Sequence, residues 1–236
     1  MLINNHLVPN ILTDLFDLFF PPACINCSEL LQIKDKYLCF SCLSELPLTH
    51  FSCQAENELE TSFRGRIPVH AATSLFYFQK KGIVQKLIHE LKYHHQPKIG
   101  SFLGQWLGEE MVASKRFELI DIVVPVPLHR DKERKRGYNQ VHSFAKSLAI
   151  ALKADLKLTL LEKSRSGQTQ TLKNREQRMM REEQEYMLKD AMLLENKHVL
   201  LVDDTITTGA TMKACADPLC HVSGLKLSLA SMAFTV

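Results

Sequence analysis

Residues 199–211 read Val199-Leu200-Leu201-Val202-Asp203-Asp204-Thr205-Ile206-Thr207-Thr208-Gly209-Ala210-Thr211, and this stretch decides the fold of the chain. Its short apolar run is typical of a strand buried on both faces in a parallel sheet. From Met212 to Cys220, apolar residues recur at helical spacing until Pro218. The hydroxyl-rich segment therefore joins the C-terminal end of a strand to a helix N-terminus, where open α/β sheets bind their ligands.

The residue types in this connection indicate a ligand that carries both a phosphate and a second polar group. Unpaired N–H groups at a helix N-terminus attract anions, and Gly209 lets the backbone approach a phosphate closely. The hydroxyls of Thr207, Thr208 and Thr211 can add donors. Asp203 and Asp204 would repel a phosphate, so they suit sugar hydroxyls, a divalent cation, or both.

Two alternatives to this interpretation exist. A P-loop enzyme also has an apolar strand that ends in aspartate, but its G-x-x-x-x-G-K-[ST] run does not occur in the sequence. The other alternative is purely structural, namely a strand with an acidic turn followed by a threonine-capped helix.

The stretch 199–211 resembles the phosphoribosyl pyrophosphate (PRPP) motif of type I phosphoribosyltransferases. The resemblance implies an α/β fold in which helices flank an open parallel sheet. It also implies that paired acids hold the ribose 2- and 3-hydroxyls of PRPP and that the following loop binds its 5-phosphate. On this chain the acids are Asp203 and Asp204, and the loop residues are Thr205, Thr207, Thr208, Gly209, Ala210 and Thr211.

Composition bounds the class of protein. A chain of 236 residues has room for one or two domains with a real core. Residues 1–22 lack a basic start, and Asp14 and Asp17 interrupt their apolar run, which argues against a signal peptide and favours an amphipathic helix. No uncharged apolar stretch reaches the roughly 18 residues of a membrane helix. We therefore expect a reduced, cytoplasmic setting without membrane insertion.

Four cysteines form two pairs near the start of the chain. Cys24-x-x-Cys27 is followed by Cys39-x-x-Cys42, and this spacing predicts one tetrahedral structural Zn²⁺ site. Such a metal would hold together a segment with too little apolar mass to fold alone. Two disulfides or four buried thiols are the alternatives.

The order of elements predicts three parts: an N-terminal helix with a four-cysteine zinc finger (1–56), a linker (57–66) and a phosphoribosyltransferase domain (67–236). Strands are expected within 69–78 and over 121–127, 158–161 and 225–236. Helices are expected from Gly82 to about 94, over 99–113 and over 141–152. Alternation of strands and helices with short turns fits a right-handed parallel sheet.

A basic stretch follows the strand at 121–127. Residues 129–181 contain 14 lysines and arginines against 5 acids, which suits pyrophosphate, nucleic acid, or only a solvated face. In type I phosphoribosyltransferases the corresponding loop binds pyrophosphate. The candidates are Arg130, Arg136, Asn139 and Gln140, with arginine favoured for its fork of donors.

The whole pattern resembles the ComF family (ComFC and GntX-like proteins), in which a zinc finger precedes a type I phosphoribosyltransferase domain. The residues that carry it are Cys24, Cys27, Cys39 and Cys42; Leu91-Lys92-Tyr93; Val124-Pro125-Val126-Pro127 with 136–140; Gln170 with Arg178; and 199–211. The resemblance implies that Gln170 and Arg178 lie in a mobile loop that closes over the substrate. It further implies a role in natural transformation, in which incoming single-stranded DNA is handled beside a helicase partner.

Three functions remain open. The first is an active transferase, in which Mg²⁺ bridges pyrophosphate and the ribose hydroxyls while an unknown acceptor attacks the anomeric carbon. The second is a regulator that binds PRPP without turnover. The third is a nucleic-acid module that uses the zinc finger and the basic stretch 129–181.

Overall fold

The computed structural model describes residues 21–32, 35–93, 96–128, 137–163 and 186–235. The chain divides into two compact units, an N-terminal unit (Met1–Leu46) and a C-terminal unit (Pro47–Val236). The boundary falls ten residues before the end of the zinc-finger part expected from the sequence. The sequence predicts a helix within residues 1–22, and positions 1–20 of this range lie outside the described residues.

The N-terminal unit has little regular structure. Its described part contains a bridge between Ala23 and Leu30 and the short helix α2 (Phe40–Ser44). Three of its five buried apolar side chains are cysteines; the five are Cys24, Leu38, Cys39, Cys42 and Leu46. So small an apolar core is typical of a segment that needs a metal or disulfides to fold.

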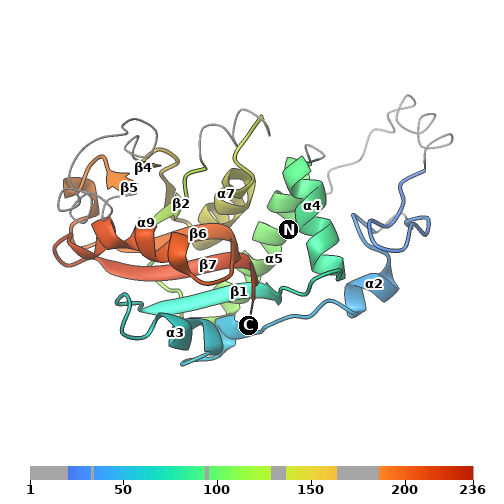
Figure 1. The fold of residues 1–236 in the computed structure, drawn as a ribbon, viewed down its shortest axis with the longest axis horizontal. Helices are drawn as coiled ribbons and strands as arrows, with labels where there is room; N and C mark the ends of the chain where they lie inside the picture. The colour runs from blue at the N-terminus through green and yellow to red at the C-terminus, as the bar shows by residue number, and fades with distance from the viewer. Residues whose placement is uncertain (1–20, 33–34, 94–95, 129–136, 164–185, 236) are drawn as a thin grey trace, which may run out of the picture. The chain divides into compact units, whose positions relative to one another are not determined.

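A five-stranded parallel sheet forms the centre of the C-terminal unit (Figure 1). Its order is β1-β7-β6-β2-β3. The strands are β1 (Ala71–Tyr77), β2 (Ile122–Pro125), β3 (Asp155–Leu156), β6 (His198–Ile206) and β7 (Lys226–Phe234). A separate antiparallel pair consists of β4 (Leu161–Lys163) and β5 (Tyr186–Leu188).

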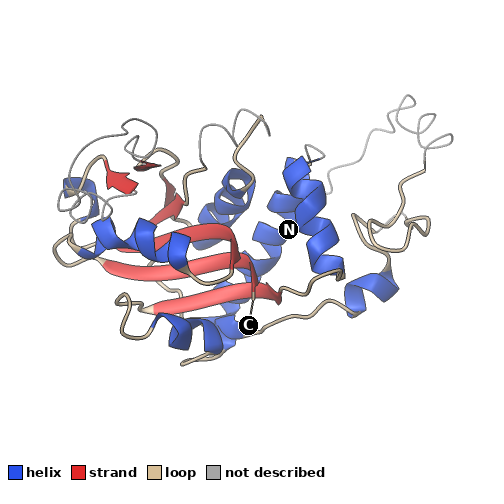
Figure 2. Ribbon diagram, in the orientation of Figure 1, coloured by secondary structure: helices blue, strands red, loops and turns tan. Residues whose placement is uncertain are grey.

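Helices cover both faces of the sheet (Figure 2). One face packs against α5 (Pro97–Ser114) and α7 (Val141–Leu152), with α4 (Ile83–Tyr93) beside α5. The other face packs against α9 (Ala210–Cys220) and α3 (Glu58–Phe63). Because side chains alternate along a strand, Val199 and Leu201 of β6 join the core on the α3 and α9 face. Two short 3₁₀ turns, Phe51–Cys53 and Met192–Leu194, complete the described elements.

A row of three glycines sets the close packing of α5 on α7. A Cβ added at Gly100 would lie 2.3 Å from Ser143 Oγ, and one at Gly104 would lie 2.5 Å from the Phe144 carbonyl oxygen. A Cβ at Gly108 would meet the Ala151 Cβ at 2.6 Å. The absence of side chains at every fourth position therefore lets the two helix backbones approach each other.

Most expected elements are present, and four differ. The strand expected at 158–161 is a turn up to Leu160, and strand structure lies on either side of it in β3 and β4. The acids at 203 and 204 do not end their strand, because β6 continues to Ile206 through pairing of Thr205 and Ile206 with β7. The helix α9 continues through Pro218 to Cys220.

The fourth difference concerns residues 57–66, for which the sequence suggests a linker. These residues form α3, and the side chain of Asn57 caps this helix by accepting from the Glu60 N–H at 3.0 Å. Leu59 and Phe63 are fully buried in the core below β1 and α9. The segment is therefore part of the C-terminal unit. No helix in the described part of the chain is long and apolar enough to cross a bilayer.

Candidate functional site

The candidate site lies where the chain reverses its direction across the sheet. From β2 the chain continues outward to β3, whereas from β6 it continues the other way to β7. β2 and β6 are neighbours, so their C-terminal ends leave a crevice at the point where the strand order reverses. The connections that follow these two strands hold the phosphate-loop and pyrophosphate-loop candidates.

Asp203 and Asp204 stand near the C-terminal end of β6, the central strand. The Asp204 N–H donates to Asp203 Oδ1 at 2.8 Å. On the α4 side, Lys92 Nζ lies 3.0 Å from Oδ1 and 2.9 Å from Oδ2 of Asp204. Both side chains of this ion pair are mostly buried, with 21% and 14% exposure. Lys92, which the sequence connects to the site only through the ComF resemblance, is thus brought to the acid pair over 112 positions of chain.

Asp203 is the acid of the pair that has no lysine partner among the described residues. Burial, and then the neighbouring Asp204 carboxylate, raise the pKa of Asp203 to about 8, against the opposing effects of the Asp204 N–H and Lys92. A carboxyl with so high a pKa keeps its proton at neutral pH unless a cation or a ring of donors joins it. A pKa perturbed by burial and a like charge is typical of functional sites.

A small pocket follows the acids. It is lined by Asp203, Thr205, Ile206, Thr207, Thr208, Gly209, Ala210, Thr211 and Met212, which include every phosphate-loop candidate. Thr207, Thr208 and Thr211 are exposed, and the α9 N-terminus opens onto the same space. Thr205 Oγ1 is buried and has no hydrogen-bond partner among the described residues. An unsatisfied buried hydroxyl in a ligand pocket indicates a group that a ligand can satisfy.

Gly209 has φ = +72°, the left-handed region that glycine adopts without strain. A Cβ at this position would lie 2.8 Å from two ring atoms of Phe63 and 3.3 Å from Arg66 Nη1. Gly209 is therefore required both by the backbone turn and by the close approach of the segment after α3.

Arg66 is a residue at the site that sequence reasoning missed. Its Nη1 donates to the Thr208 carbonyl at 3.0 Å and to the Ser62 carbonyl at 3.3 Å, and the guanidinium lies over the Phe63 ring at 5.4 Å from the centroid. The available signal was the short basic turn Arg64-Gly65-Arg66 directly before a strand. A linker interpretation of 57–66 concealed it.

The pyrophosphate-loop candidates divide into two groups. Asn139 and Gln140 are buried, and their side chains bind backbone: Asn139 donates to the Val126 carbonyl at 3.1 Å and accepts from the Val141 N–H, while Gln140 donates to the Tyr138 carbonyl at 3.0 Å. In this structure they shape the loop and start α7. Arg130 and Arg136 lie outside the described residues, as do Gln170 and Arg178.

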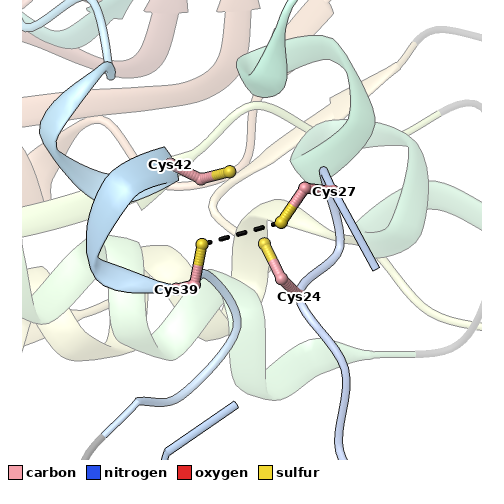
Figure 3. A group of neighbouring side chains, drawn as sticks. All are labelled: Cys24, Cys27, Cys39 and Cys42. Atoms are coloured by element: carbon pink, nitrogen blue, oxygen red, sulfur yellow. Dashed lines mark hydrogen bonds between the residues drawn. The ribbon is translucent and has the colours of Figure 1, made fainter. Parts of the chain in front are cut away.

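The N-terminal unit holds a second site. The Sγ atoms of Cys24, Cys27, Cys39 and Cys42 all lie within 4.8 Å of one another, and Figure 3 shows the four side chains pointing toward a common centre. A tetrahedral metal with bonds of about 2.3 Å to sulfur separates its ligands by roughly 3.8 Å, so the cluster fits a zinc ion. No pair of these cysteines forms a disulfide.

The thiols of this cluster have strongly divergent acidities. Burial acts to raise the pKa of Cys24, but N–H donors from Cys27, Cys39 and Asn26 outweigh it and lower the pKa to about 6. The pKa of Cys39 is raised to about 12: burial and the other thiols outweigh the Cys42 N–H. Four adjacent thiols cannot all lose their protons unless a cation offsets the negative charge. A bound metal ion supplies that positive charge.

Comparison with known proteins agrees with this architecture. Residues 142–232 match the phosphoribosyl transferase domain family. The chain is 30% identical over 140 residues to the DNA utilization protein YhgH of Escherichia coli K12, covering 56% of this chain and 59% of YhgH. It is 33% identical over 109 residues to the competence protein ComFC of Streptococcus pneumoniae, covering 46% of this chain and 44% of that protein.

A longer match is to competence protein F of Haemophilus influenzae, with 26% identity over 220 residues, 82% of this chain and 89% of that protein. Among solved structures, the glutamine PRPP amidotransferase of Bacillus subtilis, complexed with ADP and GMP, has 22% identity and a TM-score of 0.41. That alignment covers 59% of this chain and 30% of the amidotransferase.

The strand order, the acidic end of β6 and the domain match define a phosphoribosyltransferase fold with a four-cysteine cluster in a separate N-terminal unit. The chain is similar to ComF-family proteins, and its named relatives here are competence and DNA utilization proteins. The fold class and the ComF resemblance expected from the sequence are both confirmed.

Proposed function

We propose that the protein binds PRPP with Mg²⁺ at the C-terminal end of β6 and transfers its phosphoribosyl group to an acceptor. The observation that carries this proposal is the acid pair on the central strand, with Lys92 held to one acid and a threonine-lined pocket directly beyond the other. The acids are placed for the ribose hydroxyls. The pocket, with its helix N-terminus, is placed for the 5-phosphate.

The proposed reaction breaks the bond between the ribose anomeric carbon and pyrophosphate and forms a bond from that carbon to the acceptor. Pyrophosphate leaves with the bonding electrons, so negative charge develops on it, and the basic residues that follow β2 in the sequence are the candidates to offset that charge. Positioning by Asp203, Asp204 and the 205–211 loop, together with this electrostatic stabilisation, supplies the rate. The carboxylates of Asp203 and Asp204 would help to hold Mg²⁺, which would offset the negative charge of the leaving pyrophosphate.

The site fits a cation as well as a sugar. Carboxylate oxygens are the ligands Mg²⁺ prefers, and it is commonly held by one or two of them with substrate phosphates completing the shell. The raised pKa of Asp203 reflects burial and a like charge that an arriving cation would offset.

We also propose that Cys24, Cys27, Cys39 and Cys42 hold a structural Zn²⁺. The four sulfurs come from two short segments, 24–27 and 39–42, and the described part of this unit buries few apolar side chains besides its cysteines. A closed four-thiolate site leaves no open coordination position, so the ion would stabilise the unit and take no part in the transfer.

The biological context is proposed from the relatives. Their printed names concern competence and DNA utilization, which supports a role for this protein in natural transformation. A cytoplasmic setting, with single-stranded DNA and a helicase as partners, is the part of this proposal that comes from the ComF resemblance. The described residues support the sugar-phosphate site more directly than a DNA surface, because 10 of the 14 lysines and arginines of the stretch 129–181 lie outside them.

The deciding experiment is a calorimetric titration of PRPP with Mg²⁺ into zinc-loaded wild type and the Asp203→Asn/Asp204→Asn double variant. Micromolar-class binding in the wild type and its loss in the double variant are expected, because the variant keeps the shape of the site but removes its charge. A wild type that is folded and yet does not bind PRPP would overturn the proposal.

Turnover needs its own measurement. Exchange of labelled pyrophosphate into PRPP, with candidate acceptors present, is expected for a transferase. Binding without exchange under any acceptor would instead identify a PRPP sensor built on the same fold.

A further inference from the structure

The proposed phosphate pocket has no positively charged side chain in its lining. The residues that line the pocket include one acid and no base. The nearest lysines on the flanking elements have partners, since Lys92 pairs with Asp204 and Lys213 pairs with Asp217 at 2.9 Å. A 5-phosphate dianion at this position would thus meet hydroxyls and N–H groups but no cation from the loop itself.

Arg66 is not part of the pocket lining, but it is a cation in contact with the pocket wall. Its Nη1 approaches within 3.3 Å of the position a Cβ would occupy on Gly209, the N-cap of α9, and bonds the carbonyl of Thr208 in the pocket wall. Its side chain is exposed. No carboxylate in the described part of the chain pairs with it, whereas Arg64, two residues earlier, pairs with Glu56 at 3.6 Å.

The guanidinium is also held in one orientation. Phe63 is fully buried beneath it, and the guanidinium carbon lies 5.4 Å from the ring centroid, a cation–π contact that restricts the side chain. The bonds to Ser62 and Thr208 use both hydrogens of Nη1. Nη2 and Nε have no acceptor among the residues that the structure describes, so three N–H groups remain for a ligand.

We propose that Arg66 is a phosphate-binding residue that closes the 5-phosphate pocket from outside the 205–211 loop and makes the site specific for phosphorylated ribose. The proposal rests on the proposed function of that pocket. A planar fork fixed beside a helix N-terminus is the arrangement that binds a phosphate through two parallel N–H···O bonds. It also explains why α3 and the turn after it pack against this loop.

The test measures binding of ribose 5-phosphate and of PRPP with Mg²⁺ by calorimetry. It uses the wild type, Arg66→Gln, Arg66→Lys and the matched control Arg64→Gln. Glutamine can still donate to the Thr208 carbonyl, so Arg66→Gln removes the charge and fork with little change to the loop. Loss of about 10- to 100-fold in affinity for both ligands is expected, since charge-assisted hydrogen bonds are the strong ones. Arg66→Lys should lose less, and Arg64→Gln should bind as the wild type does.

A second readout separates binding from loop support. A phosphate ester loses its second proton near pH 6. The ratio of wild-type to Arg66→Gln affinity should therefore be at least about twofold larger at pH 7.5 than at pH 5.5. A ratio that stays constant would show that Arg66 acts through the loop, and the proposal would be wrong.

Two other results would also overturn it: equal affinities in wild type and Arg66→Gln, or an equal loss in Arg64→Gln. Failure of the proposed function gives a different result, because the wild type itself would then bind neither ribose 5-phosphate nor PRPP.

Discussion

Asp203 is placed where its ionisation costs stability. Its carboxyl is partly buried next to Asp204, and its pKa of about 8 lies far above the ordinary value of 3.8. The folded state therefore holds a proton that the unfolded state releases, and the free energy of unfolding falls as pH rises from about 4 to about 8.

Asp203→Asn should remove this pH-dependent loss of stability, because asparagine does not ionise. The variant keeps an oxygen for the Asp204 N–H, so it should melt at a higher temperature than the wild type, with a gain of about 1–3 kcal/mol at pH 8 that shrinks toward pH 4. Thermal melts at pH 4, 6 and 8 without ligand measure this. The control Asp155→Asn, whose exposed side chain pairs with Lys157, should change little. A gain that did not depend on pH would contradict this explanation.

The sequence predicted the position of the acids but not their environment. The order of residue types along the chain was enough to locate two acids directly after an apolar run. Arg66 could not be found in this way, because its bond to Thr208 joins positions 142 residues apart and only the packing of Phe63 on Gly209 creates it. Asn139 and Gln140 show the reverse problem: their residue types suit a ligand, yet here their side chains bind the backbone.

The packing of α5 on α7 depends on absent side chains. Gly104 lies against the Phe144 carbonyl, where a Cβ would come within 2.5 Å of a backbone oxygen that cannot rotate away. A methyl group there must push the two helices apart, and this would disturb the layer that supports Lys92 and the start of β2.

Gly104→Ala should therefore destabilise the C-terminal unit by about 1–3 kcal/mol, although alanine favours helix by up to about 1 kcal/mol. The control is Ser101→Ala on the exposed side of the same helix, which should be neutral or slightly stabilising. Urea unfolding of the two variants compares them. A Gly104→Ala variant as stable as Ser101→Ala would mean that the helices are not in close contact.

Helices and strands with clear periodicity were predicted well, and the misses have physical reasons. Periodicity gave α7 its bounds because five apolar side chains, including Phe144 and Leu148, face the core at regular spacing. The end of β6 was placed too early because acids disfavour strands, whereas pairing of Asp203, Thr205 and Ile206 with β7 outweighs that preference. The helix α3 is short and polar except for Leu59 and Phe63, so local pattern could not distinguish it from a linker.

The division into two compact units has a consequence for the whole molecule. The C-terminal unit has a continuous core on both faces of its sheet, whereas the described N-terminal unit buries little besides its cysteines. Each unit therefore depends on a different source of stability. Zinc binding supplies ~10–16 kcal/mol in small zinc-finger peptides, more than so small a core can provide.

Removing zinc should unfold the N-terminal unit and leave the other intact. We expect about one zinc per chain, released by a chelator under reducing conditions, followed by proteolytic cleavage within residues 21–46 but not within the sheet. Cys24→Ser should give the same cleavage without a chelator. Cys53→Ser should not, because this exposed cysteine lies outside the cluster.

Ribose 5-phosphate binding by the chelated protein should persist, since every residue proposed to hold it belongs to the C-terminal unit. Protein that lacks zinc as purified, or that resists cleavage equally with and without chelator, would show that the four cysteines are a thiol cluster held by the fold itself.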